Sequence, residues 1–141
     1  MWEFEHTIEV AEVTPVQVWA RYTDTATWHE WNPGILHVAL DGPFAAGTIR
    51  TTTFLDQAPL HSTITEATEN KGFTEETTLP GVATVRSIHR LSPRPGGGTL
   101  ITHRMVMDGP TVSQPAEATE DLTESLREGL KCLAKALQQT G

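Results

Sequence analysis

The sequence predicts an α+β domain in which a curved antiparallel sheet of seven strands is covered by one long C-terminal helix. Residues 2–10 alternate between apolar and polar side chains with the period of two that is typical of a strand. Turn-forming residues divide the chain from 35 to 107 into six further strand-like segments. Residues 115–139 then carry apolar side chains at helical spacing. A sheet with a single helix to cover it either packs solid or encloses a cavity, and this alternative decides which functions are open to the protein.

The first strand has one apolar face and one polar face. Trp2, Phe4, His6, Ile8 and Val10 share the apolar face, and the residues between them are glutamates and a threonine. Such a strand buries one side and leaves the other in water.

Two short helices are expected between the first and second strands. Thr14 is a typical N-cap and Pro15 suits the first helical position, so a helix begins here and carries Tyr22 on its apolar side. Asp24 can cap a second short turn, which the Asn-Pro-Gly sequence at 32–34 ends.

The other strands are separated by turns rich in Gly, Pro, Asn and Asp. Their predicted ranges are 35–41, 48–55, 60–68, 72–79, 82–91 and 100–107. The Pro- and Gly-rich stretch 92–98 lies between complementary strands, so it is a hairpin loop and not a linker. With 141 residues and no internal repeat, the chain is predicted to form one domain, residues 1–141.

The closing helix is amphipathic. Acidic residues crowd its first half, and Lys131 and Lys135 lie toward its end, as the helix dipole favours. Its apolar stripe consists of Ala118, Leu122, Leu126, Leu130, Leu133 and Leu137. Ser125 and Gly129 lie at the edge of this stripe or within it. Two explanations are open for these small residues: a close approach to the sheet, or space for a ligand beneath the helix.

Bulk properties exclude several classes of function. The net charge of −8 argues against binding to nucleic-acid backbones and anionic membranes, which attract Lys and Arg. The single cysteine, Cys132, leaves no intrachain disulfide and no thiolate metal cluster. No signal peptide precedes the first strand, and no apolar run approaches the ~20 residues that span a bilayer. We therefore expect a cytoplasmic protein without membrane insertion.

Several motifs, together with the order of the elements, resemble the START-like (SRPBCC) superfamily. They are the Trp-x-x-Trp-Asn-Pro-Gly corner at 28–34, Ile-His-Arg-Leu at 88–91, Gly-Gly-Thr at 97–99 and Asp-Gly-Pro at 108–110. The chain is most similar to the polyketide cyclase/dehydrase and lipid-transport branch, which shares the helix-grip fold of the birch-pollen allergen. The resemblance covers residues 2–139 and implies a single START-like helix-grip domain with a cavity for small hydrophobic molecules. It does not fix the activity, because members include carriers, ligand sensors, aromatase/cyclases and chaperone activators.

In this fold the two-helix segment closes one end of the cavity. The aromatic side chains Trp19, Tyr22, Trp28 and Trp31 of that segment serve either as core plugs or as walls on which a ligand stacks.

The parity of the last two strands predicts their inward face. In a regular register, the odd-numbered residues share a mostly apolar face, whereas the even-numbered face carries Arg86, Arg90 and Arg104. We therefore expect the odd-numbered face, which includes Val85, Ile101, Met105 and Met107, to point inward.

Three histidines form the sharpest site hypothesis. In the strand order of the superfamily the first strand lies beside the last, and the last beside the sixth, so His6, His103 and His89 share one inner face. They can be hydrogen-bonded structural residues, polar contacts for a ligand, or acid/base groups whose pKa lies near the operating pH. A zinc site is a further alternative. No short-spaced histidine pair supports it and the superfamily does not typically carry metal, so we predict no metal and no other cofactor.

Other polar residues give weaker signals. Glu75 shares a face with Phe73, which makes it either an inward carboxylate or a residue at the rim of the sheet. His61 alternates with apolar neighbours and is expected to face outward. Arg50, like Arg86 and Arg104, could bind a carboxylate or phosphate, but the positions of these arginines in their strands indicate solvent.

Three functions follow from these observations. The favoured one is binding of a small hydrophobic ligand, lipid- or polyketide-like, as a carrier or sensor, because no spacing forces a nucleophile or an acid/base pair. The alternatives are a polyketide cyclase/dehydrase-type enzyme with His6, His89 or His103 in proton transfer, and a protein-interaction module of the chaperone-activator type. The residues expected around the ligand are Phe4, His6, Trp28, Phe73, Glu75, Val85, His89, Ile101, His103, Met105, Leu122, Ser125, Leu126 and Gly129. The identity of the ligand and the oligomeric state do not follow from the sequence.

Overall fold

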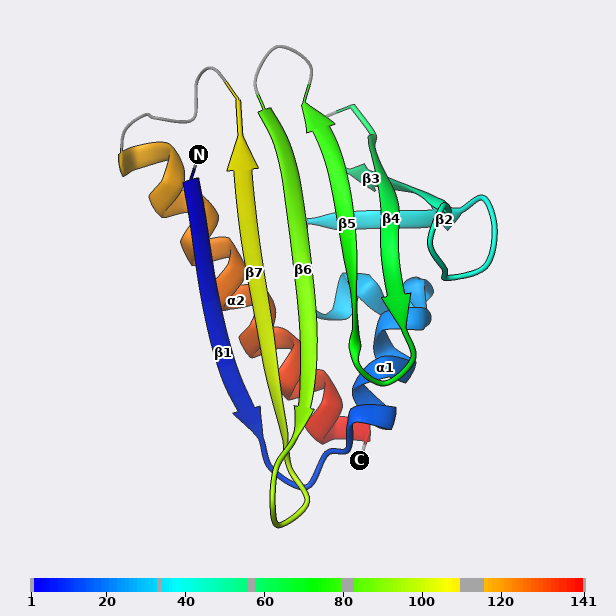
Figure 1. Ribbon diagram of the computed structural model, residues 1–141, viewed down its shortest axis with the longest axis vertical. Coiled ribbons are helices and arrows are strands. Elements are labelled where there is room, and N and C mark those ends of the chain that lie inside the picture. Colours follow the sequence, from blue (N-terminus) through cyan, green and yellow to red (C-terminus); the bar gives the residue numbers. More distant parts are fainter. Residues whose placement is uncertain (1, 33, 56–57, 80–82, 110–115, 141) are drawn as a thin grey trace.

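The computed structural model describes residues 2–32, 34–55, 58–79, 83–109 and 116–140, with side chains in the last helix described at 124 and 126–138. In this part of the chain, seven strands form one antiparallel sheet in the order β1-β7-β6-β5-β4-β3-β2 (Figure 1). The strands are β1 (Trp2–Val10), β2 (Ile35–Leu40), β3 (Ile49–Phe54), β4 (Leu60–Thr68), β5 (Gly72–Leu79), β6 (Ala83–Pro93) and β7 (Thr99–Asp108). The helical elements are α1 (Pro15–Thr23), the 3₁₀ helix η1 (Thr25–Glu30) and α2 (Ala116–Thr140).

The predicted α+β helix-grip fold is confirmed, and the element bounds differ from the prediction by only one or two residues. The final hairpin is longer than expected because its ladder continues until Pro93 pairs with Thr99. Figure 1 shows α2 crossing behind β1, β7 and β6, while α1 and η1 lie on the same side of the sheet as α2.

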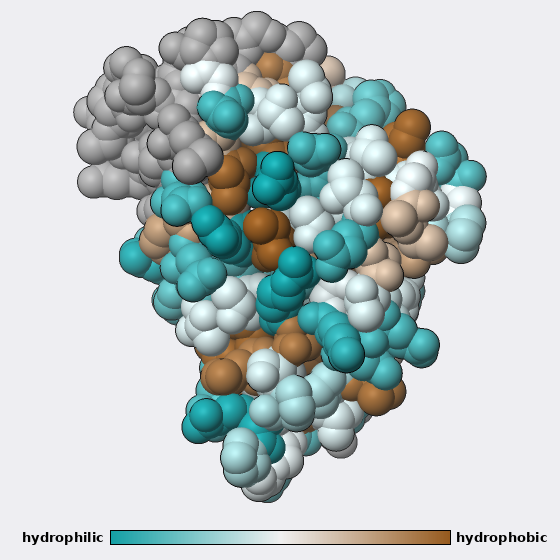
Figure 2. All heavy atoms as spheres, in the orientation of Figure 1, coloured by the Kyte–Doolittle hydropathy of each residue, from teal (hydrophilic) through white to brown (hydrophobic). Residues whose placement is uncertain are grey.

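The sheet presents its other face to solvent. Figure 2 shows this face as largely hydrophilic or neutral, with isolated hydrophobic residues. Arg90 and Arg104 lie here, with side chains 48% and 42% exposed. Arg104 pairs with Glu3 of the neighbouring strand β1, and Arg90 pairs across β5 with Glu66 of β4. His61 is exposed on this side, as predicted. Its Nδ1 atom shares a 3.0 Å hydrogen bond with the Thr51 hydroxyl.

Local chemistry explains where the helical elements begin. The Thr14 hydroxyl accepts the Gln17 N–H, and the Gln17 side chain accepts the Thr14 N–H at 2.8 Å, which completes a capping box. Asp24 occupies the N-cap position of η1, as predicted, but it contributes its backbone and not its side chain. Its backbone carbonyl accepts the Thr27 N–H at 3.0 Å, and its carboxylate makes no capping bond.

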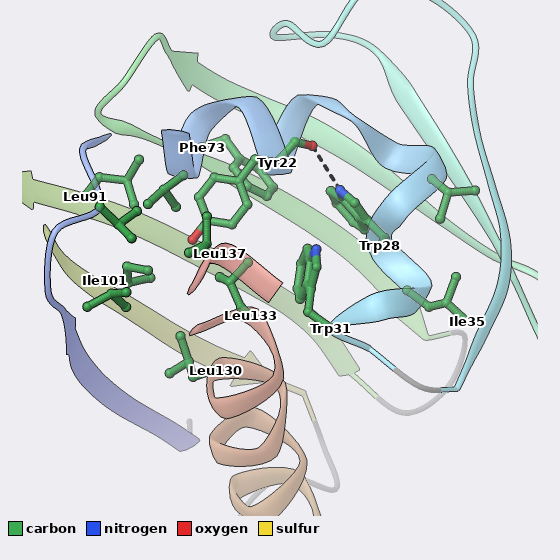
Figure 3. Close-up of a cluster of buried hydrophobic side chains, with 14 residues drawn as sticks. Tyr22, Trp28, Trp31, Ile35, Phe73, Leu91, Ile101, Leu130, Leu133 and Leu137 are labelled. Carbon is green, nitrogen blue, oxygen red and sulfur yellow. Dashed lines mark hydrogen bonds between the residues drawn. The ribbon is translucent and has the colours of Figure 1, made fainter. Parts of the chain in front are cut away.

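The core lies between the helices and the inner face of the sheet. Tyr22 of α1, Phe73 of β5, Ile101 of β7 and Leu130 and Leu133 of α2 are fully buried there (Figure 3). Within the described residues, no helix combines the length and the apolar character needed to cross a membrane.

Candidate functional site

A cavity of about 220 Å³ lies beside this core, where the inner face of the sheet meets η1 and α2. The segment from η1 to the start of β2 contributes Trp28, Trp31, Asn32 and Ile35 to its wall, and α2 contributes Leu126 and Gly129. The other strands contribute mainly polar residues, namely Arg50, Glu75, Ser87, His89, His103 and Arg104, together with Phe54 and Met105. The wall therefore combines aromatic rings with a few converging polar groups, as ligand-binding cavities commonly do.

Two indole rings form the wall contributed by η1 and its C-cap. The rings of Trp28 and Trp31 lie 5.2 Å apart, centroid to centroid. Trp28 donates its Nε1–H to the Tyr22 carbonyl at 2.9 Å, the bond drawn in Figure 3. The Nε1–H of Trp31 is buried and has no hydrogen-bond partner among the described residues. A buried donor without a partner is uncommon in folded proteins and is a group that a ligand acceptor could satisfy.

Arg50 and Glu75 form a buried ion pair on the sheet side of the cavity. Arg50 donates from Nε to one carboxylate oxygen at 2.6 Å and from Nη2 to the other at 2.9 Å. The side chains are 12% and 4% exposed, and the guanidinium carbon lies 4.7 Å from the Trp28 ring centroid. Such bidentate pairing is the strong form of the Arg–carboxylate contact.

This pair decides between the two alternatives for Glu75 and corrects the expectation for Arg50. Glu75 is not at the rim, because it lies deep on the inner face. Arg50 does not face solvent, because the even-numbered residues of β3 point inward: Thr52 is 1% exposed and Phe54 lines the cavity, whereas Ile49 is 41% exposed. The ion pair and the Trp28 ring satisfy the guanidinium inside, which makes this parity possible.

His103 and His89 lie side by side on the inner face, as the parity of β6 and β7 predicts. They are register partners, and their ring centroids are 4.5 Å apart. The Nε2 atom of His103 shares a 2.7 Å hydrogen bond with the buried hydroxyl of Tyr22. Burial lowers the pKa of His103 well below its usual value, and the neighbouring His89 and His6 add to this effect. Burial also raises the pKa of Tyr22, so this hydrogen bond joins a neutral phenol to a neutral imidazole.

His89 is also neutral at physiological pH. Burial, chiefly, and the positive charges of Arg50 and Arg90 lower the pKa of His89 to about 3, although the Phe73 carbonyl opposes this shift. Its Nδ1 lies 3.2 Å from that carbonyl, so in the neutral ring Nδ1 carries the proton and Nε2 carries a lone pair.

His6 completes the row but not the cavity wall. It pairs in register with His103, as expected, and is half-buried. The three histidines therefore occupy adjacent strands at one level, while only His89 and His103 contribute to the wall.

The other residues predicted to contact a ligand fall into three groups. Trp28, Glu75, Met105, Leu126 and Gly129 line the cavity together with the two histidines. Among the described wall residues we do not find Phe73 and Ile101, which are fully buried in the core, or Phe4 and Val85, which are half-buried. The side chains of Leu122 and Ser125 lie outside the described residues.

The structure answers the question that Gly129 raised. A Cβ atom at this position would meet only the Trp31 carbonyl oxygen, at 3.7 Å, an ordinary contact. A close approach to the sheet therefore does not require glycine here, whereas the residue does border the cavity.

The predicted ligand contacts did not include seven residues of the wall, namely Trp31, Asn32, Ile35, Arg50, Phe54, Ser87 and Arg104. Trp31 had been identified only as one of four aromatic rings, and nothing local to β3 signalled that Arg50 would turn inward. Among the described residues, no three His, Cys, Asp or Glu side chains are arranged to hold a metal ion.

A larger, open groove of about 670 Å³ lies elsewhere, between the start of α1, the β4–β5 turn and the end of β6. Charged and turn residues make up most of its wall, including the exposed Glu66–Arg90 pair, whose side chains are 57% and 48% exposed. It lies outside the space between sheet and helix, and it brings together neither the histidines nor the buried ion pair.

Solved structures share this architecture at low sequence identity. XoxI from Bacillus cereus has a TM-score of 0.78 and 18% identity, over 98% of this chain and 96% of that one. Ara h 8.0201 has a TM-score of 0.73 and 14% identity, over 98% and 99% of the two chains. Norcoclaurine synthase from Thalictrum flavum, solved in complex with dopamine and hydroxybenzaldehyde, has a TM-score of 0.74 and 13% identity, over 99% and 88%. At these identities the likeness shows the fold alone.

No curated protein matches the sequence. The family described as "Polyketide cyclase / dehydrase and lipid transport" matches residues 1–138, nearly the whole chain. With its helix-grip architecture, the chain therefore belongs to this family of the START-like superfamily.

Proposed function

We propose that the protein binds a small hydrophobic ligand in the cavity between the sheet, η1 and α2, as a carrier or sensor. The observation that carries the proposal is the composition of the cavity wall. Tryptophan and aliphatic side chains supply apolar area, while the ion pair and His89 supply a few fixed polar groups. The unpaired Nε1–H of Trp31 adds a donor that a ligand acceptor could satisfy.

The size of the cavity favours a compact ligand. Its volume of about 220 Å³ is below the ~300–1,000 Å³ common for small-molecule sites. A molecule of one or two rings suits this volume better than a lipid with a long acyl chain.

The histidines favour binding over catalysis. A general base works best when its pKa lies near the operating pH, whereas the pKa of His89 is about 3. One ring nitrogen of His103 is held by Tyr22. The alternative function, a cyclase/dehydrase-type enzyme, stays a prediction. It predicts that His89→Ala or His103→Ala lowers turnover by roughly 100-fold or more while the fold survives.

The test fills the cavity from the helix side. Gly129→Leu adds a side chain at a position that borders the cavity and where a Cβ makes only an ordinary 3.7 Å contact with the Trp31 carbonyl oxygen. Gly129→Ala is the matched control, because it changes the same helical position with little added volume. Binding of 2-methoxynaphthalene, a neutral two-ring probe, is followed by its fluorescence and by the melting temperature. At ~100 times the Kd a ligand stabilises the fold by about 2.7 kcal/mol, so saturation should be visible as a higher melting temperature.

We expect the wild type and Gly129→Ala to bind the probe and Gly129→Leu to lose binding without melting earlier. Both substitutions replace a helical glycine by a better helix former. This replacement stabilises a helix by up to about 1 kcal/mol. Equal binding to all three proteins would contradict the proposed site. Absence of binding to the wild type, both by this probe and by its hydroxyl analogue 2-naphthol, would contradict the proposed function. If the probe binds as expected, native mass spectrometry of protein purified from its own host would identify the natural ligand by its mass.

A further inference from the structure

The Arg50–Glu75 pair is the only ion pair of the described residues in which both side chains lie in the cavity wall. Its guanidinium is almost fully occupied. Two N–H groups go to Glu75, a third goes to the Thr52 hydroxyl and a fourth makes a long 3.4 Å contact with Ser62. The Trp28 ring covers one of its faces. Arg50 therefore has little capacity left for a ligand.

The carboxylate of Glu75 has more capacity. A carboxylate offers about four lone-pair sites, and each Glu75 oxygen accepts only one hydrogen bond, from Arg50, among the described residues. The side chain is 4% exposed, so bulk water does not readily satisfy the remaining sites. Because Arg50 holds the carboxylate at two points, these acceptor sites have a fixed direction.

The charges of the wall decide which ligands it tolerates. The ion pair is neutral as a whole, and its neighbours His89 and His103 are uncharged imidazoles. Arg104, the other charged residue of the wall, is 42% exposed and pairs with Glu3 on the outer side of the sheet. A ligand of either charge would bring an uncompensated charge into a buried site, which is costly. A neutral ligand avoids this cost, and a hydroxyl or N–H group on it can donate to the carboxylate.

We propose that Glu75 is the specificity-determining residue of this cavity, selecting uncharged ligands that carry a hydrogen-bond donor, with Arg50 as the positioning residue. This inference rests on the proposed function, because it requires that the cavity take a ligand. It adds a rule for the chemical class of that ligand: neutral, compact, and bearing at least one O–H or N–H.

A matched set of probes tests the rule at neutral pH. 2-Naphthol carries a donor, 2-methoxynaphthalene keeps the ring and the oxygen but lacks the donor, and 2-naphthoate carries a negative charge. We expect 2-naphthol to bind ~10- to 100-fold more tightly than 2-methoxynaphthalene, the range for a hydrogen bond to a charged acceptor. The naphthoate should bind more weakly than either, as measured by calorimetric titration.

A pair of double variants assigns the preference to Glu75. Arg50→Met with Glu75→Leu replaces the ion pair by apolar side chains, a change that buried pairs often tolerate without loss of stability. Glu76→Gln with Arg86→Gln is the control, because these residues face each other in the β5–β6 register on the outer side of the sheet. We expect the first variant to bind 2-naphthol and 2-methoxynaphthalene equally and the control to keep the wild-type preference.

The outcomes separate the two proposals. If wild-type protein binds 2-methoxynaphthalene as tightly as 2-naphthol, or 2-naphthoate most tightly, the rule for Glu75 is wrong while ligand binding stands. If the apolar variant keeps the donor preference, the assignment to Glu75 is wrong. If no probe binds, ligand binding in the cavity fails as well. The comparison of probes on the wild type decides the rule even if the apolar variant melts too early to be used.

Discussion

Tyr22 shows how a single buried hydroxyl connects the helical layer to the sheet. Its ring is fully buried among Phe73, Trp31 and the two cavity histidines, and its hydroxyl reaches His103 at 2.7 Å. Without that hydroxyl, the Nε2 atom of His103 would lose its partner in a buried site. The cost of an unsatisfied buried polar atom is about 1–3 kcal/mol.

We therefore expect Tyr22→Phe to lower the free energy of unfolding by about 1–3 kcal/mol, measured by urea denaturation. Thr7→Val is the control, since it removes the exposed Thr7–Thr102 hydrogen bond of 2.8 Å, where water can replace the lost partner. Equal effects of the two substitutions would mean that the Tyr22 hydroxyl contributes nothing special to the buried layer.

The buried ion pair leads to a prediction in which two changes do less harm than one. Arg50→Met leaves the Glu75 carboxylate buried without its partner. Glu75→Leu likewise leaves the Arg50 guanidinium buried without its partner. Removing one partner of a buried pair typically costs about 3–5 kcal/mol, whereas apolar replacement of both is often neutral or stabilising. Chemical denaturation of both single variants and the double variant should give a double variant more stable than either single one. Additive losses would show that the pair is solvated more than its exposure implies.

At the scale of elements, Gly72 determines how β5 approaches β6. Its φ is 145°, and a Cβ atom there would fall well inside the contact distance of the His89 carbonyl oxygen. Any side chain at this position must push the two strands apart beside a cavity histidine.

Gly72→Ala should accordingly destabilise the protein by more than about 2 kcal/mol and weaken ligand binding, because the displaced backbone carries His89. Gly47→Ala separates the two causes, since Gly47 also has a positive φ, 95°, but a Cβ there meets nothing within 4 Å. Thermal melting of both variants is the measurement. If Gly72→Ala lowers the melting temperature no more than Gly47→Ala does, backbone strain alone explains the destabilisation.

The elements also show what could be predicted from the sequence and what could not. The inward face of β6 and β7 was predictable, because arginines occupy one parity and apolar residues with His89 and His103 occupy the other. The same reasoning failed for Arg50 of β3, because the two hydrophobic residues of that strand, Ile49 and Phe54, lie on opposite faces and indicate no parity. The partner that draws Arg50 inward is Glu75, on β5, so its orientation depends on a tertiary contact that no pattern within β3 can reveal.

Prediction of the cavity from the sequence was limited in the same way, by tertiary contacts. Helical spacing places Leu126 and Gly129 on the face of α2 that meets the cavity, but the volume depends on how Trp31, Ile35 of β2 and Arg50 of β3 come together around it. That packing is a property of side chains from three elements at once. The sequence could therefore predict the two sides of the cavity but not its size or its ion pair.

For the molecule as a whole, two neutral histidines inside the fold couple stability to pH. An unfolded histidine titrates near ~6.5. The pKa of His89 in the folded protein is about 3, and that of His103 is also well below its usual value. Between these limits the unfolded chain binds more protons than the folded one, so stability rises with pH. The contribution is fully present above pH ~6.5 and is lost progressively as the pH falls toward ~3.

His89→Asn should flatten this dependence, because an asparagine amide can donate to the Phe73 carbonyl as Nδ1–H does but does not titrate. Urea denaturation at pH values from ~7.5 to ~4 should give a slope up to ~1.4 kcal/mol per pH unit smaller than in the wild type, the effect of one proton. The carboxylates that also titrate in acid are the same in both proteins, so the difference between the two curves isolates His89. His61→Asn provides the control, since His61 is exposed on the outer face and water surrounds it in both the folded and unfolded chain. If His61→Asn flattened the curve as much as His89→Asn, the acid sensitivity would belong to the surface and not to the histidines of the cavity wall.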